Sequence, residues 1–95
     1  MFKTTRIDES RGMIQQALDM AYGSYIEQEG KKGDIWREQS LGEIYNHLKH
    51  EIQEVQGNLK QGEIGYLCHN AMDVIELGAI LLAQAQEKLK DLNKK

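Results

Sequence analysis

The sequence has no proline and only one cysteine among its 95 residues. A single cysteine, Cys68, excludes a disulfide bond within the chain and is typical of a protein in a reducing cytoplasm. The dominant residue types are Glu, Gln, Leu, Lys and Ala, which favour helices, and nothing in the chain demands a sheet. We therefore predict an all-α protein.

Long hydrophobic runs and strong charge are also missing. No stretch approaches the roughly 18 consecutive apolar residues of a membrane-spanning helix, and residues 1–6 lack the apolar centre of a secretion signal. The net charge is −3, from 12 basic and 15 acidic residues. Such mild acidity argues against nucleic acid or an anionic membrane surface as the main partner. We expect a cytoplasmic protein that binds neither.

The length fits a single domain covering residues 1–95. Apolar residues make up 40% of the chain, which is too many for a disordered segment. A chain this short buries only a modest share of its own surface. If its helices are long and amphipathic, we expect a second subunit to complete the core.

The first helix is predicted from Asp8 or Ser10 to Gln28, because apolar residues recur there at three- and four-residue steps. Either of those first residues can cap the helix start, and Gly30 lies just past its end. Residues 29–34 contain two glycines, four charges and no apolar residue, which predicts a loop.

The second helix has the clearest start. Ser40 and Glu43 have the spacing of a capping box, in which each side chain bonds the other residue's backbone N–H. We predict that this helix ends near Lys60, with Gly62 as the stop, and that a third helix covers residues 63–92. Short connections favour antiparallel neighbours, so the expected fold is an antiparallel helical bundle.

Polar side chains interrupt both of these helices at matching intervals. Glu51 and Glu54 stand three residues apart, and so do Asn70 and Asp73, so the members of each pair can point to one spot. Two carboxylates aimed together repel each other unless a cation or a proton lies between them. If the helices pack antiparallel, the two pairs can face each other.

An all-oxygen cluster of this kind suits Mg²⁺, with Mn²⁺ as a substitute. Because Mg²⁺ prefers phosphate oxygens as its remaining ligands, a substrate that carries phosphate is the natural expectation. Glu76 also interrupts an apolar run. It either lies on a remaining solvent face or adds a further carboxylate, and the sequence leaves both readings open.

Three segments of the sequence, taken in order and spacing, resemble the MazG-type all-α nucleoside triphosphate pyrophosphohydrolases. They are Trp36-Arg37-Glu38-Gln39-Ser40, Leu48-Lys49-His50-Glu51-Ile52-Gln53-Glu54-Val55 and Asn70-Ala71-Met72-Asp73-Val74. The family motif is E-x-x-E, a linker of a dozen or more residues, and E-x-x-D. Glu51 and Glu54 match the first pair and Asp73 matches the final aspartate, with fifteen residues between Glu54 and Asn70.

The resemblance implies a Mg²⁺-dependent hydrolase that cleaves a nucleoside triphosphate between its α and β phosphates. The products are a monophosphate and pyrophosphate, and the bundle is completed as a homodimer or homotetramer. Glu51, Glu54, Asn70 and Asp73 would hold the metal, and Glu51 or Glu54 would act as general base. Asn70 stands where the family has a third acid, and we expect this neutral residue to weaken metal affinity.

The expected substrate contacts are Trp36, stacking on the base, and His47 beside the acidic residues. A lysine would neutralise phosphate charge, and the candidates are Lys49, Lys31, Lys32 and Lys60. Each also has an ordinary structural reading, as a core anchor, a surface histidine and a solvated lysine. Cys68 falls on the apolar stripe and is expected to be a small core residue. The rival hypothesis for the whole chain is a non-catalytic helical module that self-associates, with its acidic residues on a solvated face.

Overall fold

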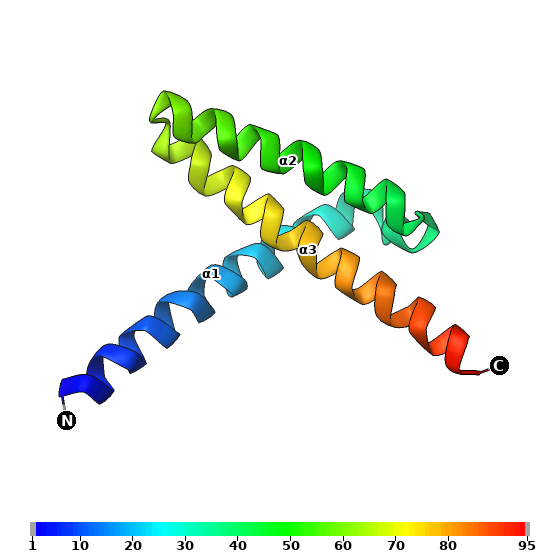
Figure 1. Ribbon diagram of the computed structural model, residues 1–95, viewed down its shortest axis with the longest axis horizontal. Coiled ribbons are helices and arrows are strands. Elements are labelled where there is room, and N and C mark those ends of the chain that lie inside the picture. The colour runs from blue at the N-terminus through cyan, green and yellow to red at the C-terminus, as the bar shows by residue number, and fades with distance from the viewer. Residues whose placement is uncertain (1, 95) are drawn as a thin grey trace.

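The computed structural model describes residues 2–94, with side chains from Thr5 onward. It contains three α-helices, α1 (Phe2–Lys32), α2 (Leu41–Gln61) and α3 (Ile64–Asn93), and one short 3-10 helix, η1 (Ile35–Glu38). Residues 2–94 include no strand, so the predicted all-α class is confirmed. Helices α2 and α3 form an antiparallel hairpin, and α1 crosses α3 near its middle (Figure 1).

Local capping chemistry sets the ends of α2. The Ser40 Oγ accepts a hydrogen bond of 3.1 Å from the Glu43 backbone N–H, and the Glu43 carboxylate accepts one of 2.9 Å from the Ser40 N–H. These bonds hold the pKa of Glu43 below its usual value. Gly62 ends the helix in the left-handed conformation, with φ of 69°. The predictions for the second and third helices are therefore confirmed to within a residue or two.

The predicted limits of the first helix are wrong at both ends. Helix α1 begins at Phe2, so Asp8 and Ser10 lie inside it, and it continues through Gly30 to Lys32. The stop is Gly33, which has φ of 68° and donates its N–H to the Glu29 carbonyl at 2.8 Å. Two lysines in the last turn favour the longer helix, because cations stabilise a helix C-terminus. Helix η1 was not predicted.

The described side chains form a very small core. Its buried apolar members are Ala21, Ile44 and Leu77. The radius of gyration is 16.3 Å, whereas a compact domain of this length would have about 12 Å. Cys68 is exposed, so its prediction as a core residue is wrong: neither α1 nor α2 covers its face of α3. The helices are well formed, but one chain does not enclose their apolar surfaces.

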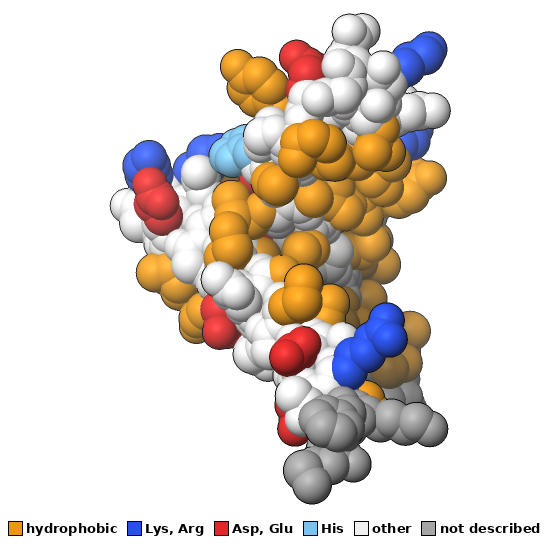
Figure 2. Space-filling view, turned by 90° about the vertical axis from the view of Figure 1, so that its left-hand side faces the viewer, with side chains coloured by type: hydrophobic (Ala, Val, Ile, Leu, Met, Phe, Trp, Pro, Cys, Tyr) orange, Lys and Arg blue, Asp and Glu red, His pale blue; other side chains and the backbone are white. Residues whose placement is uncertain are grey.

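Helices α1 and α3 both carry a large part of this uncovered apolar surface, and α3 is the more apolar of the two in composition. By length and composition alone α3 could cross a membrane, a test that core helices of soluble proteins also pass. Only 6% of its most apolar 18-residue window is buried, and hydrophobic side chains occupy much of the face in Figure 2. The expectation that the chain avoids membranes stays a prediction. Within the described residues, much of the apolar surface of α3 is therefore left uncovered.

The two candidate capping serines give a direct test of the helix boundaries. We expect Ser40→Ala to lower the free energy of unfolding by about 1 kcal/mol, because an unpaired N–H remains at the start of α2. Ser10→Ala should leave stability unchanged or raise it slightly, because Ser10 lies inside α1 and alanine favours a helix interior. Urea unfolding followed by circular dichroism measures both. Equal losses for the two variants would contradict the observed start of α1.

Candidate functional site

The α2–α3 hairpin brings carboxylates from both helices to one cavity. A side-chain hydrogen bond of 2.6 Å from Asn70 Nδ2 to Asn58 Oδ1 links the two helices near their turn. Further from the turn, Glu51, Asp73 and Glu76 line a cavity of about 450 Å³, and α1 and η1 supply its other wall. This volume lies within the ~300–1,000 Å³ typical of small-molecule sites.

Glu51 is the most buried acid on α2. Its side chain is 14% exposed, and its Oε2 is buried with no hydrogen-bond partner among the described residues. The other oxygen, Oε1, lies 3.7 Å from His47 Nε2. Burial raises the pKa of Glu51, and the nearby charges of Glu54 and Asp73 raise it further, against an opposing effect of His47 and His50. Glu51 is therefore prepared to take up a proton or a cation.

Glu76 is the site residue that the sequence left open, and the structure places it in the cavity. Its Oε1 is buried and has no partner among the described side chains. Relative to the buried Leu77, Asp73 and Glu76 lie about 40° and 100° round α3 in the same direction. Their shared side of the helix faces the cavity. The available clue was the interruption of the apolar run at Glu76.

Three of the predicted site residues do not line this cavity. Glu54 is 46% exposed and lies 3.4 Å from His50. Asn70 is occupied by its bond to Asn58, and the Lys49 ammonium lies 5.7 Å from the centre of the Tyr45 ring. Among residues 5–94, no three His, Cys, Asp or Glu side chains form a group that could hold a metal ion as they stand. Glu51, Asp73, Trp36 and His47 do line the cavity.

Helix geometry explains why Glu54 and Asn70 stand apart. On α2 the apolar stripe centres near Leu48, and Glu51 lies about 70° from its centre whereas Glu54 lies about 130° away. The spacing of three residues therefore takes Glu54 out toward solvent. On α3, Asn70 lies about 20° from Leu77 on the side opposite to Asp73. This position turns Asn70 toward α2, where it meets Asn58.

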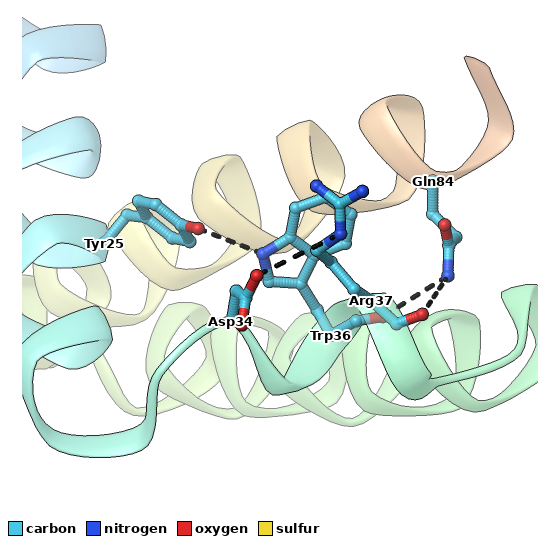
Figure 3. A network of polar contacts seen from close by, with 5 residues as sticks. All are labelled: Tyr25, Asp34, Trp36, Arg37 and Gln84. Atoms are coloured by element: carbon cyan, nitrogen blue, oxygen red, sulfur yellow. Dashed lines mark hydrogen bonds and ion pairs between the residues drawn. The ribbon is translucent and has the colours of Figure 1, made fainter. Parts of the chain in front are cut away.

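Trp36 forms part of the opposite wall and is held by polar contacts (Figure 3). Its indole Nε1 donates to the Tyr25 hydroxyl at 3.0 Å. The Arg37 guanidinium lies 5.7 Å from the centre of the indole ring and 4.0 Å from Asp34. Lys32 contributes a cation to the same cavity. The cavity thus combines carboxylates from α2 and α3 with an aromatic residue, one lysine and a further carboxylate, Glu29, on the α1 side.

No family model, curated protein or solved structure matches the chain. The MazG-type resemblance therefore rests on the sequence segments given above.

The raised pKa of Glu51 predicts a gain in stability on neutralising this residue. The protonated form is favoured in the folded state, so its contribution is complete below about pH 4.5 and is lost as the pH rises through the raised folded value. We expect Glu51→Gln to stabilise the metal-free protein at pH 7 by on the order of 1 kcal/mol. The gain should disappear near pH 4. Thermal unfolding in EDTA across this pH range measures it.

Glu54→Gln is the matched control for this experiment, since Glu54 is exposed and stands one turn further along α2. It should give a smaller gain at pH 7. Destabilisation by Glu51→Gln at neutral pH would show that the Glu51 charge is already compensated.

Proposed function

We propose that this chain is a Mg²⁺-dependent nucleoside triphosphate pyrophosphohydrolase of the MazG type, located in the cytoplasm. It would convert a ribo- or deoxyribonucleoside triphosphate to the monophosphate and pyrophosphate. The observation that carries the proposal is the cavity itself. Glu51, Asp73 and Glu76 converge on it from two helices, opposite Trp36 and Lys32. An aromatic face, a cation and several carboxylates are the features that a metal-complexed nucleotide needs.

Carboxylate oxygens are the donors that a hard divalent cation prefers, although the carboxylates of this cavity do not form a metal-binding group as they stand in the described residues. Glu51 Oε2 and Glu76 Oε1 are buried without partners among the described residues, and a buried carboxylate oxygen with no donor is costly. Glu51, Asp73 and Glu76 are the residues that would hold Mg²⁺ or Mn²⁺. The chemistry that such a cation supplies is neutralisation of phosphate charge and a lower pKa for water.

The chain's own residues supply the remaining chemistry. Glu51, which lines the cavity and contacts His47, is placed to accept a proton from the attacking water. Glu54 contributes through its charge, which raises the Glu51 pKa from a distance. Trp36 offers a face for a nucleobase, and Lys32, which lines the cavity where Lys49 does not, can neutralise phosphate charge.

Self-association is part of the same proposal. Three buried apolar residues are too few to stabilise a chain of this length, and large side chains such as Met13, Ile14 and Leu82 are more than half exposed. A homodimer or homotetramer would cover the apolar faces of α1 and α3. Further copies of this chain are the simplest partners to cover these apolar faces, because most soluble oligomers are built from identical subunits.

A non-catalytic, self-associating helical module is the second candidate. The observation in its favour is Asn70, which is neutral and engaged by Asn58 at the position where the resemblance expects a metal-binding acid. The same exposed apolar faces would drive its assembly. In this alternative, the acidic cavity would bind neither metal nor nucleotide.

An activity assay separates the two candidates. The protein is incubated with each nucleoside triphosphate and Mg²⁺, and pyrophosphate release is measured. We expect turnover of at least one nucleotide and a loss of about 100-fold or more in Asp73→Asn, because the lost carboxylate charge binds the cation directly. Helical content should be unchanged.

Asp91→Asn is the control for that variant, because Asp91 is an exposed carboxylate on the same helix. It should keep wild-type turnover. Full turnover in Asp73→Asn would exclude the assigned site. Absence of product from every nucleotide, with no thermal shift on adding Mg²⁺ or Mn²⁺, would favour the non-catalytic module.

A further inference from the structure

Gln84 occupies an unusual place in α3. It is a buried polar residue, only 5% exposed, in a helix whose other buried residue is Leu77. The two stand seven residues apart, which places them on one face of the helix. An apolar side chain would suit such a position, since a buried amide is costly unless its hydrogen bonds are made. The bonds that Gln84 makes therefore indicate what it does.

Those bonds all join α3 to the segment around η1, and Figure 3 draws the two to Trp36 and Arg37. The Gln84 Nε2 lies 2.8 Å from the Gln39 carbonyl oxygen, 3.2 Å from that of Arg37 and 3.4 Å from that of Trp36. Carbonyl groups at the end of a short helix often lack partners within the helix; that of Trp36 already accepts the Gln39 N–H at 3.1 Å, so Gln84 is a second donor to it. One side chain of α3 thus supplies a donor for a turn that lies 45 to 48 residues earlier in the chain.

Trp36 is consequently held at two points. Its backbone carbonyl is bonded by Gln84, and its indole N–H donates to the Tyr25 hydroxyl on α1. The indole lines the acidic cavity and also the apolar hollow between α1 and α3. Because Trp36 belongs to the wall between these spaces, a shift of η1 would change the shape of the cavity.

We propose that Gln84 is a positioning residue that fixes Trp36 in the wall of the cavity and so prepares the surface on which a nucleobase stacks. The identity of the ligand rests on the proposed function, whereas the placement of Trp36 does not. Rigid placement matters for affinity because a wall that must be ordered on binding consumes part of the interaction energy. Gln84 acts through Trp36 and does not itself line the acidic cavity.

The test uses Trp36 as its own reporter, since it is the single tryptophan of the chain. Gln84→Leu keeps the size and removes the donor. We expect a red-shifted emission and stronger acrylamide quenching. We also expect KM for the nucleotide to rise about tenfold while kcat stays within about twofold, because one base–aromatic stack is lost. Gln56→Leu, at an exposed glutamine of α2, is the control and should change neither readout.

Gln84→Glu keeps the test decisive if the leucine variant fails to fold. At pH 8 its carboxylate cannot donate to the three carbonyls, so Trp36 should be exposed. On acidification the protonated carboxyl regains one donor, and the emission should return toward that of the wild type, whose emission stays constant. Wild-type emission in both variants at pH 8 would overturn the proposal, and so would a Gln84→Glu emission that acid does not restore.

The nucleotide assay and the Trp36 fluorescence test different claims, so one can fail without the other. A wild-type protein that hydrolyses no nucleotide would remove the proposed function, while the fluorescence comparison would still decide the role of Gln84. A tenfold rise in KM with unchanged Trp36 emission would place the effect elsewhere and contradict the positioning role.

Discussion

A carboxylate oxygen that is removed from water and meets no donor destabilises a folded protein, and the α2–α3 hairpin buries two of them. Glu51 and Glu76 reach the same cavity from different helices, with Asp73 beside them. The burial that raises the Glu51 pKa also strengthens the attraction of a divalent cation to the cavity. The proposed chemistry depends on this uncompensated negative charge. A bound cation would stabilise the buried carboxylates and would also neutralise the phosphate charge of the substrate.

The wall of the cavity that contains η1 and Trp36 is held in place by hydrogen bonds. Helix η1 is too short to be stable by itself, and Gln84 of α3 donates to two of its carbonyl groups, those of Trp36 and Arg37. Trp36 is thereby held against α1 through Tyr25. The cavity is thus framed by elements far apart in sequence, whereas the apolar faces of α1 and α3 remain open. The polar site is well defined within one chain, and the hydrophobic core is not.

The parts of the fold that were predictable are those controlled by local chemistry. The capping box at Ser40 and the glycine at Gly62 fixed the limits of α2, because both act within a few residues. Helix α1 was mispredicted because Asp8, Ser10 and Gly30 are compatible with a helix interior when nothing else breaks the helix. Helix η1 escaped prediction because Gln84, which bonds its Trp36 and Arg37 carbonyl groups, lies more than forty positions away.

The sequence predicted the type of side chain at the candidate site better than it predicted which residues line the cavity. Glu51 and Asp73 were identified from their spacing, and both line the cavity. Glu54 and Asn70 share that spacing but lie elsewhere, because a step of three residues turns a helix by about 60° short of a full circle. Whether a residue lines the cavity depends on how α2 and α3 are aligned with each other. The hydrogen bond between Asn70 and Asn58 is one of the contacts that define this alignment. That alignment is a tertiary property, which the helix patterns alone did not supply.

We propose that Glu76 provides a cation-binding carboxylate and that Asn70 does not. Titration of the protein with Mn²⁺, followed by electron paramagnetic resonance, tests it directly and without turnover. We expect Glu76→Gln to weaken Mn²⁺ binding by about tenfold or more, equal to about 1.4 kcal/mol, and Asn70→Ala to leave it near the wild-type value. Unchanged binding in Glu76→Gln, together with loss of binding in Asn70→Ala, would contradict it.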